Sequence, residues 1–191
     1  MAIEDLIFKL SNNPGDPYLN YEVALEYERL NQTASAVSFF LRTVEYGEVF
    51  NGFAADIQYV SLLKIAHCLA DQIDRVASVK NVLFQALTVR ADRPEAYFLL
   101  SQFYERQGDW QECYSMAYLG YFQQKEHQQP KLDRFVGYYD DYCLEFQMAV
   151  SAWWIGRKAE SKELFKKLSE MDLAPEYMAS VEDNLARIAS L

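Results

Sequence analysis

The stretch Pro94–Gly120, PEAYFLLSQFYERQGDWQECYSMAYLG, decides the fold of this chain. Apolar and small residues recur three or four positions apart on both sides of its centre, which is the spacing of one face of an α-helix. Gly108 can take the left-handed conformation that ends a helix, and Asp109, with a glutamate three residues later, can cap the next one. Asp92 gives the same capping pattern ahead of the first helix. The stretch therefore predicts two helices joined by a tight turn.

The same frame recurs three more times along the chain. Leu100 of the quoted stretch corresponds to Val23, Ala66 and Met148 in the other copies. Two of these copies lie 34 residues apart, which is the period of a known class of helical repeats. The other spacings are longer, and they place insertions around Gly47–Asp56 and Gln123–Asp140. The second insertion is either a surface loop or a feature specific to a partner.

This pattern resembles the tetratricopeptide repeat family, in which small residues lie where helices approach closely and aromatic residues fill the spaces between them. Ser101, Thr43 and His67 depart from it, because the family prefers glycine or alanine at their positions. The resemblance implies an all-α fold: a right-handed superhelical stack of about four helical hairpins with a capping helix at each end. We expect a single domain over 1–191, with repeats near 17–46, 59–91, 93–122 and 141–170 and capping helices near 2–11 and 175–190.

A narrower resemblance links the order of segments to the helical repeat region that follows the catalytic domain of bacterial and phage family 2 glycosyltransferases. It rests on Tyr59–Ala66, Arg93–Tyr97 and Ala149–Gly156. Those enzymes hold a metal and a sugar diphosphate with an Asp-x-Asp pair, and this sequence has none. Its Asp140 and Asp141 are adjacent and would point in different directions on a helix. The resemblance therefore implies an accessory or scaffold protein that works beside such an enzyme.

The composition limits the class of partner. The formal net charge is −10, with 28 acidic and 18 basic residues, and a chain this acidic suits neither nucleic acid nor an anionic membrane as its main partner. A basic protein or peptide fits better as a partner. The alternative interpretation is that the negative charge only keeps the protein soluble. The first ten residues, MAIEDLIFKL, lack the positive charge of a secretory signal. We expect a cytoplasmic protein.

The residues that carry catalytic or metal chemistry are sparse or scattered. The three cysteines are widely spaced and fit buried thiols on helices better than a disulfide or zinc site. Glu22 and Glu26 would share a helix face, but acidic residues on repeat helices are more often solvated than catalytic. The sequence therefore predicts no enzyme activity, no metal and no cofactor.

The resemblance implies that the first helix of each hairpin lines a concave binding face. Projecting the frame onto the chain gives these candidate partner-binding residues: Tyr21, Phe98, Gln102, Glu105, Phe146, Trp153 and Trp154. Aromatic residues are enriched where interfaces gain most of their binding energy. The competing interpretation is that several of them are core, above all Phe146 and Trp153, which can pack against the final helix. Consecutive helical residues point about 100° apart, so Trp153 and Trp154 cannot both fit one buried seam.

Two functions remain open on this basis. The first is a protein-interaction scaffold that binds another protein or peptide, with a glycosyltransferase as one candidate. The second is a glycan-binding accessory, in which Tyr138, Tyr139, Trp153 and Trp154 would stack against sugars.

Overall fold

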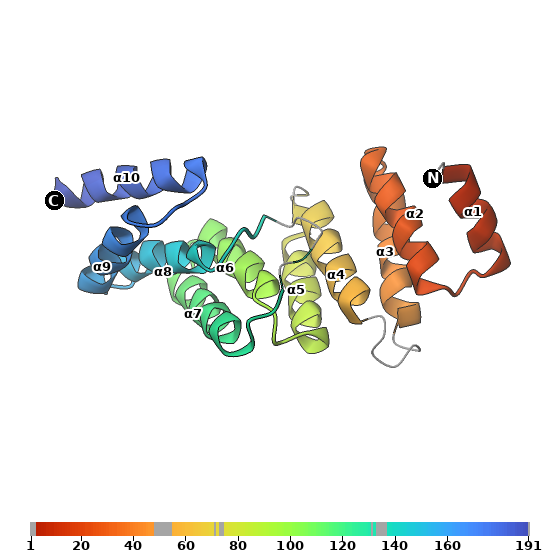
Figure 1. Ribbon diagram of the computed structural model, residues 1–191, viewed down its shortest axis with the longest axis horizontal. Coiled ribbons are helices and arrows are strands. Elements are labelled where there is room, and N and C mark those ends of the chain that lie inside the picture. Colours follow the sequence, from red (N-terminus) through yellow and green to blue (C-terminus); the bar gives the residue numbers. More distant parts are fainter. Residues whose placement is uncertain are drawn as a thin grey trace. The chain divides into compact units, whose positions relative to one another are not determined.

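The computed structural model describes residues 3–47, 55–70, 72, 75–130, 132 and 137–190. Within these residues the chain forms ten α-helices and no strand (Figure 1), which confirms the all-α prediction. Parts of both expected insertions, residues 48–54, 131 and 133–136, lie outside the described residues. The chain divides into two compact units, Met1–Ala91 and Asp92–Leu191, and the expectation of a single domain over 1–191 stays a prediction. Each unit is described by itself.

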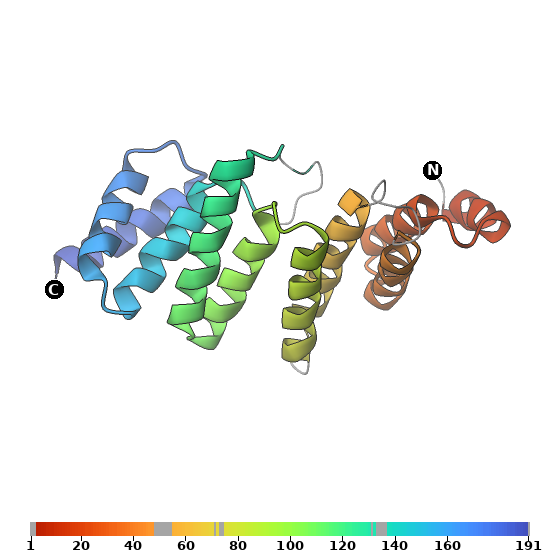
Figure 2. The ribbon, with the colours of Figure 1, turned by 90° about the horizontal axis from the view of Figure 1, so that it is seen from below.

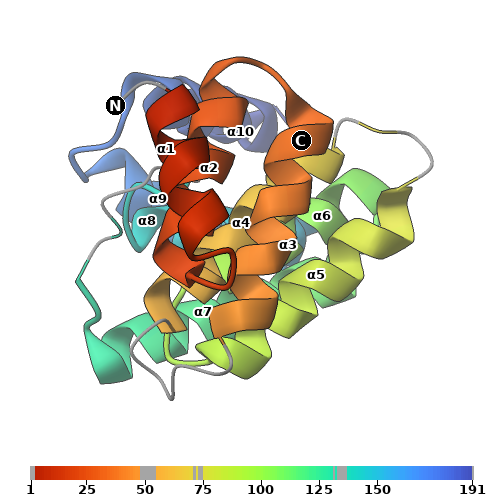
Figure 3. The same ribbon diagram turned by 90° about the vertical axis from the view of Figure 1, so that its right-hand side faces the viewer.

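Unit 1 contains five helices, and each packs on the next one along the chain. In Figure 3 the first helix lies beside the second at the N-terminal end. The helices are α1 (Ile3–Asn12), α2 (Pro17–Arg29), α3 (Thr33–Gly47), α4 (Ala55–Ala70) and α5 (Val76–Val89). Unit 1 thus consists of two helical hairpins, α2–α3 and α4–α5, with α1 ahead of them.

Local chemistry sets the ends of these helices. The Asp16 carboxylate accepts hydrogen bonds from the backbone N–H groups of Tyr18 and Leu19 at 2.9 and 3.1 Å, and Pro17 occupies the first turn of α2. At the end of α3, a Cβ on Gly47 would lie only 2.4 Å from Cγ of Gln58 in α4. Glycine at this position therefore lets the two hairpins approach each other closely.

The core of unit 1 begins at its first helix. Leu6 and Leu10 of α1 are buried against Val23 of α2. Farther along, Lys64 of α4 forms an ion pair with Glu28 of α2 at 3.0 Å. These contacts join α1 and α4 to the hairpin between them.

Unit 2 also contains five helices that pack in chain order, and α6 additionally contacts α8. Figure 2 shows α7 between α6 and α8. The helices are α6 (Glu95–Gln107), α7 (Trp110–His127), α8 (Tyr142–Trp154), α9 (Lys158–Ser169) and α10 (Pro175–Ala189). The hairpins α6–α7 and α8–α9 are followed by α10 as a single flanking helix, which agrees with the predicted hairpin stack.

The predicted turn between α6 and α7 is present. Gly108 has φ of 71° in the left-handed region, and the Asp109 carboxylate accepts a hydrogen bond from the N–H of Glu112 at 3.3 Å. Near the middle of α7, a Cβ on Gly120 would lie 2.6 Å from Cβ of Tyr97. Gly120 thus lets α7 lie close against α6, as its small-residue position in the repeat frame suggests.

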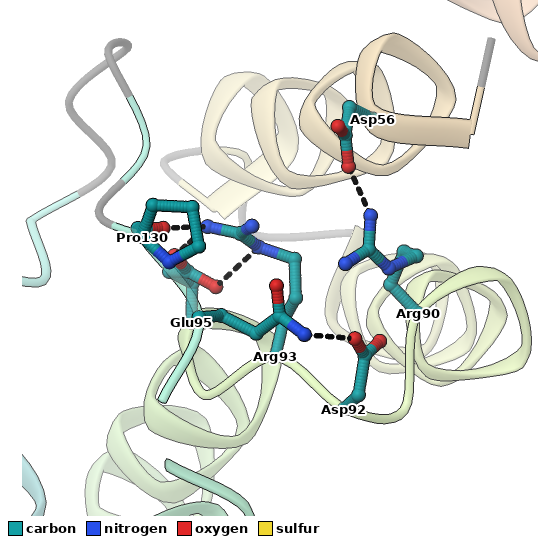
Figure 4. Close-up of polar contacts among 7 residues, drawn as sticks. Asp56, Arg90, Asp92, Arg93, Glu95 and Pro130 are labelled. Carbon is teal, nitrogen blue, oxygen red and sulfur yellow. Dashed lines mark hydrogen bonds and ion pairs between the residues drawn. The ribbon is translucent and has the colours of Figure 1, made fainter. Parts of the chain in front are cut away.

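The predicted cap at the start of α6 is wrong. Pro94 precedes the helix without a side-chain cap, and the Asp92 carboxylate instead accepts from the Gln129 amide at 2.6 Å. Figure 4 shows the buried Arg93 side chain between the Glu95 carboxylate and the backbone carbonyl of Pro130. Glu95 pairs with Arg93 at 2.8 Å, because a buried guanidinium is costly unless its charge is paired.

The same figure shows an ion pair within unit 1. Arg90, just after α5, pairs with Asp56 in the first turn of α4. A carboxylate is favoured at a helix N-terminus by the helix dipole, so this pair joins the two ends of the α4–α5 hairpin. Among the described helices, none combines the length and apolar character that a bilayer-spanning segment requires.

Candidate functional site

Two of the seven predicted partner-binding residues are core residues. Tyr21 of α2 is 5% exposed and its ring centroid lies 6.0 Å from that of Phe40 in α3. Phe98 of α6 has no exposed surface, and its ring packs on Tyr138 at 5.5 Å. Neither side chain can contact a partner without local unfolding, so their assignment to a binding face is corrected.

The burial of Phe98 has a non-local cause. After α7 the chain reaches the start of α6. There the Gln129 amide donates a hydrogen bond to the Asp92 carboxylate, and the Arg93 guanidinium donates one to the Pro130 carbonyl (Figure 4). Farther along this link, Tyr138 lies over Phe98. The described part of the second insertion therefore covers the face of α6 that the repeat frame leaves open.

Phe146 of α8 belongs to an aromatic cluster. Its ring makes edge-to-face contacts with Phe165 of α9 at 6.0 Å and Tyr177 of α10 at 5.3 Å. Tyr177 also packs on Tyr142 at 5.2 Å. Phe146 is partly buried in this cluster, so the interpretation that it packs against the final helix is the better one.

Glu105 and Gln102 of α6 are both partly exposed. The Glu105 carboxylate accepts a hydrogen bond from the Gln147 amide of α8 at 3.0 Å, and the Gln147 carbonyl oxygen lies 3.5 Å from the Cys113 sulfur. Burial, together with the nearby Glu105 charge, raises the pKa of Cys113 to about 12, so this thiol stays protonated. The Glu105 side chain is thus oriented by a buried polar chain that runs through α8 to α7.

The two consecutive tryptophans have different surroundings. Trp154 is 61% exposed, and one face of its ring stacks on Trp110 of α7 with centroids 5.3 Å apart and planes 17° apart. Trp153 is partly buried, and the Lys158 ammonium lies 4.8 Å from the centre of its ring. The exposed ring of Trp154 is held from one side only and is open to a ligand on the rest of its surface.

Both tryptophans line a pocket of about 230 Å³ that three helices form within unit 2. Its walls are Val150, Trp153 and Trp154 from α8, Phe165 from α9, and Asn184, Arg187 and Ile188 from α10. Arg187 also forms an ion pair with Asp183 one turn earlier at 2.9 Å. The pocket therefore combines aromatic and aliphatic walls with one amide and one guanidinium on α10.

The residues of α10 were missing from the sequence-based site. The periodicity of Met178, Val181, Leu185 and Ile188 indicates a capping helix and gives no sign that its C-terminal half forms a pocket wall. The sequence feature that could have indicated this wall is the pair Asn184 and Arg187, two polar residues three positions apart beside the apolar stripe of the helix. Of the predicted residues, the structure brings Trp153 and Trp154 together at this pocket and leaves Gln102 and Glu105 outside its walls.

The size of the pocket and the charges near it limit the ligands that it can hold. It is smaller than the clefts of roughly 300–1,000 Å³ that hold drug-sized ligands, so it accommodates one or two side chains. Arg187 in its wall and Lys158 next to Trp153 can pair with a carboxylate. In the described part of the chain, no three His, Cys, Asp or Glu side chains lie together as a metal-binding group.

Comparison with known proteins shows the fold. No family model matches the chain, and no curated protein matches its sequence. A solved structure of a MamA RS-1 ArsTM double mutant is 15% identical, with a TM-score of 0.62 over 88% of this chain and 82% of that one. YrrB, described as a TPR protein with an unusual peptide-binding site, is 12% identical, with a TM-score of 0.51 over 95% of this chain and all of that one. The fold is of the tetratricopeptide type.

In a tetratricopeptide-type hairpin the first helix lies on the concave side. In unit 2 these first helices are α6 and α8, and α10 follows in the position of the next one. The pocket thus lies between α8 and α10, with the buried Phe165 of α9 in its wall. Around Phe98 the face predicted from the sequence is covered by Tyr138, and the binding role of Trp153 and Trp154 at its C-terminal end stays a prediction.

Proposed function

We propose that this chain is a protein-interaction module that binds a short segment of another protein at the pocket between α8 and α10. The observation that carries the proposal is the exposed Trp154 ring at the edge of an apolar pocket whose other walls are already assembled. Tryptophan and arginine are the residues most enriched at binding hot spots, and this pocket contains both.

The ligand follows from the pocket chemistry. An aliphatic or aromatic side chain would enter between Trp153 and Ile188, because burial of apolar surface supplies most of the binding energy. A carboxylate next to that side chain would meet Arg187 and Lys158. The expectation of a basic partner rests on the excess of acidic residues over the whole chain, whereas at this pocket the nearby cations favour an acidic flank.

A glycosyltransferase remains the candidate partner that the narrower sequence resemblance suggests. In this proposal the chain would dock on such an enzyme or on a protein that accompanies it, without taking part in sugar transfer. Co-elution of the purified chain with a family 2 glycosyltransferase domain from the same source tests this, and separate elution at micromolar concentrations of both proteins would count against it.

A glycan ligand is the second candidate, and one observation favours it. The stacked Trp110 and Trp154 present an outward indole face, which is a surface that suits a sugar ring. Tyr138 is no longer available for this role, because it packs on Phe98. A glycan array in which binding to the chain disappears in Trp154→Ala would support this alternative over a peptide ligand.

The deciding experiment is selection from a phage-displayed library of random peptides on the immobilised chain. We expect enrichment of an aromatic or aliphatic residue flanked by Asp or Glu, and loss of these peptides with Trp154→Ala. Arg187→Glu should shift the flanking preference from acidic to basic residues. Tyr118→Ala on α7, which removes another half-exposed aromatic ring, is the matched control and should leave selection unchanged. Absence of enrichment, or peptides that bind wild type and both pocket variants equally, would refute the proposal.

A further inference from the structure

Two described residues of the link between α7 and α8 lie against α6, on the face where the repeat frame predicts a binding residue. The Tyr138 ring packs on Phe98 with centroids 5.5 Å apart. Earlier along the link, the Pro130 carbonyl accepts a hydrogen bond from the buried Arg93 guanidinium at 2.9 Å (Figure 4). A ring against an apolar side chain and a main-chain carbonyl on an arginine are contacts that a bound peptide makes. Here the chain makes them with itself.

The Tyr138 side chain is an imperfect occupant of this face. Within the described part of the chain, its hydroxyl oxygen is buried without a hydrogen-bond partner. Burial also raises the pKa of this hydroxyl, so it stays protonated and remains a donor without an acceptor. A buried polar group without a partner costs free energy that an apolar group of the same shape does not. A phenylalanine ring would therefore make the contact with Phe98 more favourably than Tyr138 does.

We propose that Tyr138 is an internal ligand, which keeps this face of α6 closed until a segment of another protein replaces it. The contacts on α6 do not depend on the identity of the link. Every peptide offers a main-chain carbonyl to Arg93, and any apolar ring can pack on Phe98. The replacing segment carries a phenylalanine where Tyr138 now lies. This site is separate from the pocket between α8 and α10, whose walls include neither Phe98 nor Tyr138.

Charge defines the residues next to that phenylalanine. Three carboxylates act on the Tyr138 hydroxyl, those of Asp141, Glu95 and Asp140. Ion pairs within the chain compensate the charges of Glu95 and Asp141 in part, but the chain as a whole has a net charge of −10. A lysine or arginine beside the phenylalanine complements this acidic surrounding. The α6 site thus selects a basic, aromatic segment, whereas the pocket between α8 and α10 favours an acidic flank.

The link competes with such a segment because it is tethered. A segment on a short tether acts at an effective concentration of about millimolar, so an external segment binds the wild-type chain only weakly. The apparent affinity falls with the fraction of molecules in which the site is open. The side chain at position 138 therefore determines how tightly an external segment binds.

The test is fluorescence anisotropy with a labelled synthetic peptide of residues 128–139 that carries Tyr138→Phe. This peptide contains two basic residues and one acidic residue. We expect the Tyr138→Ala chain to bind it at least about 10-fold more tightly than wild type, because the internal ring no longer competes. Tyr138→Leu, which keeps apolar cover over Phe98, should fold if Tyr138→Ala does not, and it should bind with intermediate affinity. Tyr139→Ala is the matched control: it removes the neighbouring ring, which is 37% exposed, and should bind like wild type.

Three further measurements make the result specific. Tyr138→Phe in the whole chain should bind the peptide less than wild type and unfold at a higher urea concentration, because its ring closes the site without burying a hydroxyl. Adding Trp154→Ala to Tyr138→Ala should leave peptide binding unchanged, and its loss would place the peptide in the other pocket and overturn the inference. Equal affinity of wild type, Tyr138→Ala and Tyr138→Leu would also overturn it. So would binding that persists when alanine replaces the phenylalanine of the peptide.

Discussion

Replacing Trp154 with alanine is expected to weaken ligand binding strongly and to destabilise the fold less than the loss of a core residue does. The side chain is 61% exposed, so about two-fifths of the roughly 250 Å² that a tryptophan can bury is removed from water. This area of about 100 Å² corresponds to about 2.5 kcal/mol at 25 cal/mol per Å². Because an extended reference chain overstates burial, the expected loss of unfolding free energy is about 2 kcal/mol.

Phe98→Ala provides the comparison for a core residue. Phe98 has no exposed surface and packs on Tyr138, so its truncation leaves a cavity and should cost about 3–5 kcal/mol. Urea unfolding followed by far-ultraviolet circular dichroism measures both losses without relying on tryptophan fluorescence. Titration calorimetry with a peptide from the phage selection measures affinity. The association constant should fall about 30-fold or more in Trp154→Ala.

The two readouts together can refute the reasoning. If Trp154→Ala loses as much unfolding free energy as Phe98→Ala, Trp154 is a core residue and the pocket has lost its proposed anchor. If its stability stays within about 2 kcal/mol of wild type and affinity is unchanged, Trp154 does not contact the ligand.

Three further predictions concern the framework of unit 2. Gly120→Ala should lose about 1–3 kcal/mol of unfolding free energy in urea, because its new Cβ would lie 2.6 Å from Cβ of Tyr97. Gly15→Ala, whose Cβ would have 4.0 Å of room, should change by less than about 0.5 kcal/mol. Burial raises the pKa of Cys113 from 9.0 to about 12. The protonated thiol therefore contributes fully to the free energy of unfolding below pH 9, and this contribution is lost as pH rises from 9 toward 12. Over the same pH range Cys113→Ala should lose less unfolding free energy than wild type. Lys167→Ala should cost about 1–3 kcal/mol by leaving the buried Glu145 carboxylate without its ion pair, and adding Glu145→Met should recover most of it.

Local signals in the sequence were sufficient for the hairpins. The turn at Gly108 and the cap at Asp109 depend on residues within four positions of each other, and the structure contains both. Gly120 stands at a small-residue position of the repeat frame, and the structure places it where α7 meets α6. Helix periodicity and turn chemistry depend on nearby residues. The four hairpins could therefore be predicted by aligning the rest of the chain with the single stretch Pro94–Gly120.

The candidate site depends on contacts that local patterns do not encode. Phe98 occupies a concave-face position in the frame, but Tyr138, 40 residues later, covers it. Arg187 stands in the predicted capping helix near 175–190, yet it lines the pocket together with Trp153. In both cases one member of the contact, Tyr138 or Arg187, comes from a segment outside the repeat pattern, so periodicity alone gives the wrong environment.

The tandem tryptophans show how the end of one helix can form a binding site. α8 ends at Trp154, and consecutive helical residues point about 100° apart. The Trp154 ring therefore stacks on Trp110 of α7, while Lys158 at the start of α9 covers the ring of Trp153. Trp110 supports Trp154 from the preceding hairpin, and α10 closes the opposite wall with Arg187 and Ile188. The pocket therefore exists only while α7, α8, α9 and α10 are packed together. A ligand that binds it must stabilise that packing, because it binds the assembled helices and not the unfolded chain.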